Sequence, residues 1–463
     1  MAEKVKDCLL ISRPSRREFL GSAGAAGIAL TATDSGWASI GASPLESEPT
    51  SNPVSNSIAA ETAVFIEDLQ RRCYRFFLES THPLTGLVAD RARTDGTWRS
   101  PYASSATCGF SLVADAIAAT SSWGQRELAE QRTEKILDTM LHRVEHERGF
   151  FYHFIDATTY RRAFPSEISS IDTAIFVAGA MVASSVFSDN SSIVSLSDQI
   201  IDRIDWQWML NGSDQFSMGW TPEGGFLPTR WDRFSELTLM VLIAIGARDH
   251  AVPPACWRAW RRDDVLNHNG QSYLSYPPLF VHQYPQAFFD FRKYVSPSGR
   301  SYWNNSVTAH QAQVTYLSKL AQLDPYTFGH YGSELWGLTS SDSSAGYRDW
   351  GGPYRVNSVY PERGMDGTIV PSAAAGGLPI LPDETLKTLL YQRNQFGDQI
   401  YGRYGFVNAY NPRTGWIGSD VIGIDTGISL IMAENFRSGK VWDLFMEHDI
   451  ARRGFELAGF QPA

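Results

Sequence analysis

Four acidic residues stand at the start of apolar runs, where carboxylates could act together. Glu167 and Asp172 enclose Ile-Ser-Ser-Ile, Glu236 precedes Leu-Thr-Leu-Met, and Asp425 precedes Thr-Gly-Ile-Ser-Leu. Two carboxyl groups can cleave a glycosidic bond, since one supplies a proton to the leaving oxygen and the other activates water. Each residue also has a structural explanation, because an acid at a helix start caps backbone N–H groups and is favoured by the helix dipole.

The surroundings of these carboxylates suggest different roles. Asp425 lies between Gly-Ile and Thr-Gly at a helix start that favours the ionised form, so it suits the general base. Glu236 lies between Phe234 and an apolar run that favours the protonated form, so it suits the general acid. We expect this pair to stand roughly 6.5–9.5 Å apart, as an inverting mechanism requires. We expect Glu167 and Asp172 to hold a sugar and to tune the neighbouring carboxyl groups.

Aromatic and polar loop residues are the candidates for sugar binding. Flat rings stack on the C–H faces of pyranoses while amides and carboxylates bind the hydroxyls, although core packing is the alternative for any single ring. The predicted binding residues are Glu223, Trp220, Trp231, His153, Trp336, Asp342 and Asp366. We expect the three tryptophans to share one groove near Glu236. For His153, a satisfied histidine in the core is the alternative.

No cofactor, metal centre or nucleic-acid partner is indicated. The sequence has neither a Ser-centred nucleophile elbow nor a phosphate loop, and its cysteines lack the spacing of a zinc site. We expect Cys73, Cys108 and Cys256 to be buried thiols. With 40 Lys and Arg against 50 Asp and Glu, the net charge of -10 disfavours a phosphate backbone.

The elements that must position these side chains are helices. Ile171–Val186 and Leu237–Ala247 are apolar on every face, whereas Gln125–Val144 carries charge on one side. Such alternation predicts two concentric layers in an all-α barrel or toroid, with an irregular helical bundle as the alternative. The expected helices are Glu61–Glu79, Ser105–Thr120, Gln125–Val144, Ser170–Phe187, Ile193–Met209, Asp232–Ala247, Val307–Leu323, Asp383–Tyr391, Thr426–Phe436 and Val441–Leu457.

The amino terminus has the pattern of an export signal. Ser15–Leu20 gives S-R-R-x-F-L and precedes the small, weakly apolar run Gly21–Ala32, as is typical of a twin-arginine signal. We expect a signal peptide at 1–33, a disordered linker at 34–60, and one catalytic domain at 61–463 in the periplasm or outside the cell. An ordinary basic terminus is the alternative. Membrane insertion of the mature chain is not expected, because no later run of about 18 uncharged apolar residues occurs.

Six motifs in unbroken order resemble the bacterial glucoamylase-like domain family, which includes the endo-β-1,2-glucanases of glycoside hydrolase family 144. The motifs are Gly149–Asp156, Ser166–Ala174, Phe280–Arg292, Trp336–Tyr347, Asp366–Pro379 and Ile422–Gly439. The resemblance implies an (α/α)6 barrel with aromatic-rich loops at one end, and metal-free hydrolysis of β-1,2-glucan with inversion. It places the family's acidic positions on Glu167, Asp172, Glu236 and Asp425.

Two other functions stay open on the same barrel. One is a polysaccharide lyase or transglycosylase, although a lyase would need an Arg cluster that the sequence does not show locally. The other is an envelope glycan-binding or assembly protein that keeps the cleft without the chemistry. Thr426 and Ile428 stand where the family commonly has Gln and Pro, which makes the fold a firmer expectation than the substrate.

Overall fold

The computed structural model describes residues 53–355 and 361–463. The expected twin-arginine signal and most of the expected linker lie outside these residues. Helix α1 (Pro53–Ser80) begins inside the segment expected to be a linker. Proline suits the first position of a helix, because its fixed φ is helical and its missing N–H needs no partner there.

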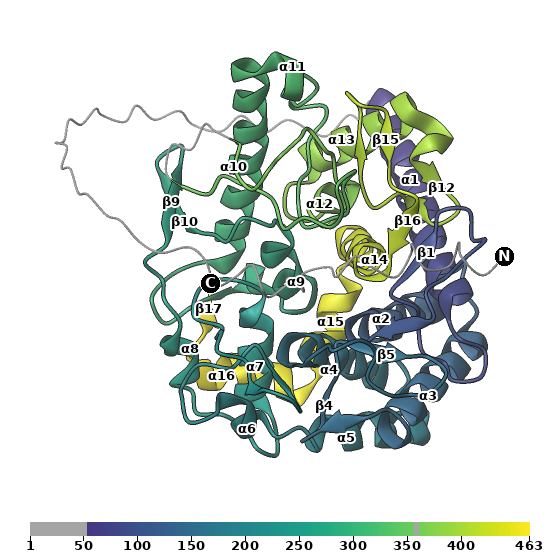
Figure 1. Ribbon diagram of the computed structural model, residues 1–463, viewed down its shortest axis with the longest axis vertical. Helices are drawn as coiled ribbons and strands as arrows, with labels where there is room; N and C mark the ends of the chain where they lie inside the picture. Colours follow the sequence, from purple (N-terminus) through teal and green to yellow (C-terminus); the bar gives the residue numbers. More distant parts are fainter. Residues whose placement is uncertain (1–52, 356–360) are drawn as a thin grey trace.

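Two concentric layers of helices form the predicted (α/α)6 barrel (Figure 1). Within the described residues, the inner layer consists of α2 (Ser105–Thr120), α4 (Ser170–Val186), α7 (Leu237–Gly246), α9 (Phe280–Phe288), α12 (Pro371–Ala375) and α14 (Gly423–Arg437). The outer layer includes α1, α3 (Arg126–His142), α5 (Ser191–Asp202), α10 (Tyr302–Leu323) and α13 (Pro382–Phe396). Every residue of α7 is buried, as its apolar sequence predicts.

The inner helices α2 and α4 cross with their backbones in contact. A Cβ atom on Gly179 would lie 2.2 Å from the carbonyl oxygen of Gly109, and a Cβ on Gly109 would lie 2.6 Å from the Cα of Phe176. Only glycine permits this approach. The crossing fixes the two helices relative to each other and so fixes the side chains that their first turns carry.

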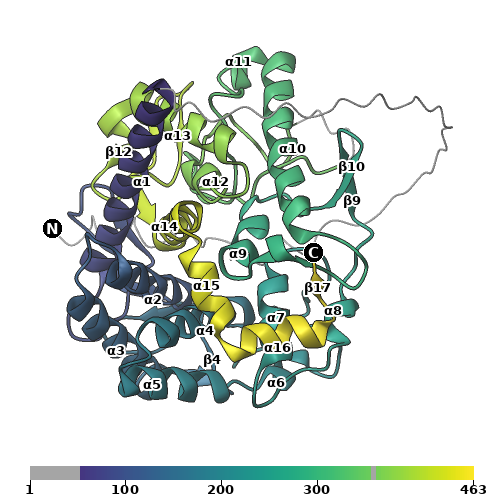
Figure 2. The ribbon, with the colours of Figure 1, turned by 180° about the vertical axis from the view of Figure 1, so that it is seen from behind.

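The C-terminal segment crosses the other side of the molecule (Figure 2). Helix α15 (Lys440–Glu447) packs on α4, α9 and α14, and α16 (Asp449–Ala458) packs on α7. A single helix was expected over Val441–Leu457, but His448 breaks it by accepting a hydrogen bond from the N–H of Ile450 at the start of α16. Likewise, Asp205 caps α6 (Trp206–Leu210) and divides the helix expected over Ile193–Met209.

Short strand pairs lie where the inner helices begin. Strand β2 (Tyr102–Ser104) runs into α2, β6 (Ile168–Ser169) into α4, and β16 (Asp420–Ile422) into α14. Their antiparallel partners are β5 (Phe154–Asp156), β7 (Gly219–Thr221) and β1 (Arg91–Arg93), and β7 also pairs with β8 (Gly225–Phe226). These ladders connect the N-terminal ends of the inner helices.

The described part of the chain bears on the expectations for its cysteines and for membrane-spanning helices. Its three cysteines, Cys73, Cys108 and Cys256, are free and buried as predicted. Over the same residues, none of the helices combines the length and apolar character needed to cross a bilayer.

Candidate active site

Backbone hydrogen bonds bring the predicted acidic residues to one end of the barrel. Gly423, the first residue of α14, donates to the Asp90 carbonyl at 2.8 Å, and Ser105, the first residue of α2, donates to the His153 carbonyl at 3.2 Å. The N–H of His153 in turn donates to the Glu167 carbonyl at 2.9 Å, just before β6 and α4. The first turns of α14 and α4 therefore carry their carboxylates at the same end.

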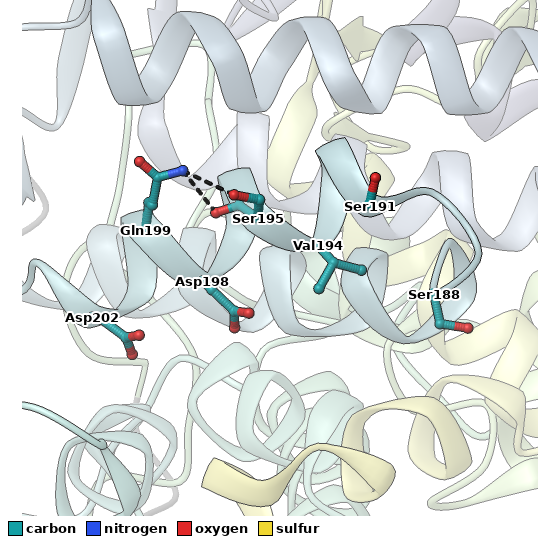
Figure 3. Close-up of a pocket in the computed structure, with 7 residues that line it drawn as sticks. All are labelled: Ser188, Ser191, Val194, Ser195, Asp198, Gln199 and Asp202. Atoms are coloured by element: carbon teal, nitrogen blue, oxygen red, sulfur yellow. Dashed lines mark hydrogen bonds between the residues drawn. The ribbon is translucent and has the colours of Figure 1, made fainter.

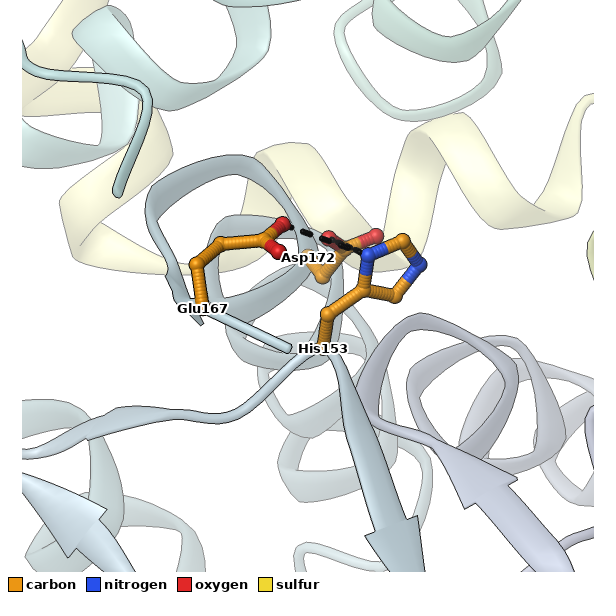
Figure 4. Close-up of side chains that lie close together, drawn as sticks. All are labelled: His153, Glu167 and Asp172. Carbon is orange, nitrogen blue, oxygen red and sulfur yellow. Dashed lines mark hydrogen bonds and ion pairs between the residues drawn. The ribbon is translucent and has the colours of Figure 1, made fainter. Parts of the chain in front are cut away.

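His153, Glu167 and Asp172 lie together there (Figure 4). The Nδ1 atom of His153 lies 3.3 Å from Oε1 of Glu167 and 3.9 Å from Oδ2 of Asp172. The two acids are 6% and 2% exposed. Three of the predicted site residues therefore lie close together, and the imidazole faces carboxylates.

The same three side chains could also hold a cation. Their ligand atoms, one nitrogen and two carboxylate oxygens, all lie within 4.8 Å of one another. Imidazole with carboxylate is a donor set that suits several divalent metals. The absence of a metal from the reaction stays a prediction.

Helix capping explains the position of Asp172 but not that of Asp425. Ser169 caps α4, since its Oγ accepts a hydrogen bond from the Asp172 N–H at 3.0 Å and donates one to Oδ2 of Asp172. In helix α14 the N-cap position is instead taken by Ile422, which gives no side-chain cap, and Asp425 lies in the first turn. Nδ2 of Asn408 donates to Oδ2 of Asp425 at 2.6 Å. Asp425 is thus positioned by a neighbouring loop.

Asn408 connects Asp425 to Arg91, a partly buried arginine. Its Oδ1 accepts from the Asp342 N–H at 2.8 Å, and Oδ2 of Asp342 accepts from Arg91 at 2.8 Å. Arg91 also pairs with Asp90 at 3.3 Å and Asp420 at 3.4 Å. Burial lowers the pKa of the Arg91 guanidinium, but these three carboxylates raise it, and the net pKa lies above its usual value. Sequence reasoning missed Asn408 and Arg91, because no short motif connects them to their partners.

Glu236 is the residue immediately before α7. Its backbone is helical, its side chain makes no capping hydrogen bond, and it is 5% exposed. In the segment leading to α7, Nε1 of Trp231 donates to Oγ of Ser170, the first residue of α4, at 2.9 Å. This bond connects the approach to Glu236 with the helix that carries Asp172. Phe234, two residues before Glu236, is also buried, and the apolar surroundings expected for the Glu236 carboxyl group stay a prediction.

The predicted groove of three tryptophans is wrong. Trp336 is 0% exposed and its Nε1 donates to the Glu384 carbonyl at 3.3 Å, while Trp231 is 4% exposed. A ring buried on both faces cannot stack on a sugar, and both indoles instead contribute apolar area to the core while their N–H groups are satisfied. Trp220, on β7, is half-buried and packs on Trp208 with ring centroids 5.9 Å apart.

The remaining predicted binding residues differ in their surroundings. Glu223 is exposed at the turn between β7 and β8, 2.5 Å from Nη1 of Arg162, and this hydrogen bond lowers the pKa of its carboxyl group. Asp366 accepts hydrogen bonds from the N–H and Oγ1 of Thr368 at 3.0 and 2.6 Å, which gives it a local role in a turn. Asp342, as described, lies between Arg91 and the Asn408 amide.

A pocket also lies on the outer layer along α5 (Figure 3). It is lined by Ser188, Ser191, Val194, Ser195, Asp198, Gln199 and Asp202. None of the predicted catalytic or sugar-binding residues is among them. It belongs to the outer surface of the barrel rather than to the end that carries the carboxylates.

Comparison with known proteins agrees with the barrel fold. Residues 228–449 match the family model described as "Putative glucoamylase". This part of the chain is similar to that family. The glucoamylase-like segment contains Glu236, Asp342, Asn408 and Asp425.

Relatives extend the likeness over most of the chain. An exo-β-1,2-glucooligosaccharide sophorohydrolase of Parabacteroides distasonis is 23% identical over 429 residues, covering 84% of this chain, which spans 57% of that relative's length. An endo-β-1,2-glucanase of Chitinophaga pinensis, solved with sophorotriose and glucose, has a TM-score of 0.78 and 22% identity, covering 86% of this chain and 98% of that one. A β-1,2-glucanase structure from Parabacteroides distasonis has a TM-score of 0.76 and 21% identity, covering 86% and 60%. These structures share the fold.

Proposed function

We propose that the protein is an exported glycoside hydrolase that cleaves β-1,2-glucan by an inverting acid/base mechanism. The observation that carries this proposal is the gathering of carboxylates, from the first turns of α4 and α14 and the residue before α7, at one end of the barrel. Asp172 and Glu236 are buried there and Asp425 is half-buried. Relatives that act on β-1,2-linked glucans support the choice of substrate.

Asp425 acts as the general base in this proposal. The amide of Asn408 donates to its Oδ2, and a hydrogen bond to the charged form favours an ionised carboxylate. The start of α14 adds the positive end of the helix dipole. Asp425 therefore has the surroundings of a group that accepts a proton from water as the water attacks the anomeric carbon.

Glu236 acts as the general acid and protonates the leaving glycosidic oxygen. It is buried at the head of an apolar helix, and burial disfavours the charged form of a carboxyl group. Glu167, Asp172 and His153 hold a sugar through its hydroxyl groups. An acid and a base on opposite sides of the bond with room for one water between them would invert the anomeric carbon.

Incubation of the purified protein with linear β-1,2-, β-1,3-, β-1,4- and α-1,4-glucans tests this function. We expect shorter oligosaccharides from the β-1,2-glucan, and their length distribution will distinguish internal from terminal cleavage. Unsaturated products would instead identify a lyase, and products longer than the substrate a transglycosylase. Binding without any cleavage would identify a glycan-binding protein.

Export through the twin-arginine pathway is a separate part of the proposal. It is supported by the order of Arg16, Arg17, Phe19 and Leu20 ahead of a weakly apolar run. Replacing both arginines with lysine keeps the charge but removes the guanidinium pair, so the precursor should accumulate in the cytoplasm. An unchanged periplasmic yield would contradict export by this route.

A further inference from the structure

A row of aromatic rings leads from the carboxylate cluster to the surface. The imidazole of His153 stacks on Phe154, with centroids 4.1 Å apart and planes at 12°. Phe154 meets Phe164 edge to face at 5.9 Å and 89°, and Phe164 also contacts Tyr102 at 4.4 Å. Phe164 is 55% exposed. The row therefore ends on an aromatic ring in solvent, two ring contacts from the imidazole that faces Glu167.

The backbone at Phe164 is in an unusual conformation. Its φ is +57°, in the left-handed region that bulky residues rarely adopt. The loop around it is nevertheless well fixed, because the Ala163 N–H donates to the Phe154 carbonyl at 3.0 Å and Ser166 Oγ donates to the Ala163 carbonyl at 2.8 Å. Residues with a strained backbone cluster at functional sites. A ligand for the ring would account for both the strained backbone and the exposed ring.

A charged group from another loop borders the same segment. Arg162, two residues before Phe164, pairs with Glu223 at 2.5 Å, and the side chain of Glu223 is 66% exposed. The turn between β7 and β8 thus places a solvent-facing carboxylate against the loop that presents the ring. An aromatic face with a nearby hydroxyl acceptor is the combination that binds pyranoses.

We propose that Phe164, supported by Tyr102, is a stacking platform for a glucosyl unit of the substrate chain beyond the sugar held by Glu167, Asp172 and His153. This inference rests on the proposed function, because it takes the ligand to be a glucan. The platform contributes to the binding of long chains and takes no part in bond cleavage. Oligosaccharides too short to reach it do not depend on the ring.

The variant Phe164→Asn tests the platform without disturbing the backbone. Asparagine tolerates a positive φ and lacks the ring, so the fold and the thermal unfolding midpoint should be kept. We expect the KM for long β-1,2-glucan to rise about 3- to 10-fold, in line with the loss of one aromatic contact, at unchanged kcat. Kinetics on the shortest oligosaccharide that is cleaved should not change. Phe164→Trp, which keeps a ring, should retain the wild-type KM.

Tyr326→Asn is the matched control. Tyr326 is 80% exposed on α11 (Pro325–Phe328), which lies far from β5 (Figure 1). An equal rise in KM in this variant, or wild-type kinetics of Phe164→Asn on long glucan, would overturn the proposal.

If the wild-type protein cleaves none of the four glucans, calorimetry with their oligosaccharides separates the two hypotheses. Binding that weakens in Phe164→Asn would then support the platform although the hydrolase has failed. Equal binding by the two proteins, or no binding at all, would overturn the platform.

Discussion

The hydrogen bond from Asn408 to Asp425 offers a sharp test of how the proposed general base is held. Two variants separate the contacts of the asparagine. Asn408→Leu has a similar volume and removes both the 2.6 Å donor to Asp425 and the 2.8 Å acceptor of the Asp342 N–H. Asn408→Asp keeps an acceptor for Asp342 but places a second carboxylate where the donor to Asp425 stood.

The expected loss of activity follows from the strength of the hydrogen bond between Asn408 and Asp425. A hydrogen bond to a charged group contributes about 1.5–3 kcal/mol, and each 1.36 kcal/mol is about tenfold in rate, so Asn408→Leu should lower kcat/KM by roughly 10- to 150-fold. It should also destabilise the fold by about 1–3 kcal/mol, because the partly buried Asp342 N–H loses its acceptor. Asn408→Asp should cost at least as much activity, since like charges in contact favour protonation of one of them.

The assay is the pH dependence of kcat/KM on β-1,2-glucan. In both variants the acidic limb should move to higher pH, because the ionised form of the base has lost a donor or gained a like charge. Asn411→Leu is the control, since Asn411 is as buried as Asn408 but donates to the Asp366 carbonyl at 2.9 Å. It should lose stability without moving the acidic limb. Wild-type kcat/KM and an unmoved limb in Asn408→Leu and Asn408→Asp would refute the reasoning.

Three further variants test the surrounding structure. Ser169→Ala removes the cap of α4 and the partner of Asp172, and should lower the free energy of unfolding by about 0.5–2 kcal/mol in urea titrations; an unchanged midpoint would count against the cap. Arg91→Met leaves three carboxylates without their shared cation and should destabilise the protein by about 3–5 kcal/mol at neutral pH, less in acid where they become protonated. Burial lowers the pKa of His310 to about 4, below its value of 6.5 in the unfolded chain, so stability should fall by up to about 3 kcal/mol as the pH drops from 6.5 towards 4. His310→Gln should flatten that slope, and an equally steep slope in the variant would assign it to other groups.

Local sequence patterns predicted the helices well where a helix is determined by its own residues. Ser105–Thr120 agrees with α2 at both ends, and α4 and α7 are buried on every face as their apolar sequences indicated. The inner helices α9 and α12 were missed because nine and five residues are too few for periodicity to show.

The difference between local and long-range causes also explains which site residues the sequence could indicate. Glu167, Asp172, Glu236 and Asp425 could be found because a carboxylate at the start of an apolar helix is a local signal. Arg91 could not be found as their neighbour, because its partner Asp342 is 251 residues further along the chain. Trp336 was misjudged for a related reason, since a buried indole and a sugar platform look the same in a sequence. What distinguishes them is the packing on both faces of the ring, which tertiary structure alone decides.

The initial rate of β-1,2-glucan hydrolysis by the isosteric variants Glu236→Gln and Asp425→Asn tests the central claim most directly. Each variant should fold with a thermal midpoint close to wild type and lose about two to four decades of kcat, because each removes one of the two proton transfers. NMR of the wild-type reaction should show that the newly formed reducing ends have the inverted anomeric configuration. Full activity in either variant, or retained configuration, would contradict the assignment and return Glu223, Glu167 and Asp172 as candidates for the role.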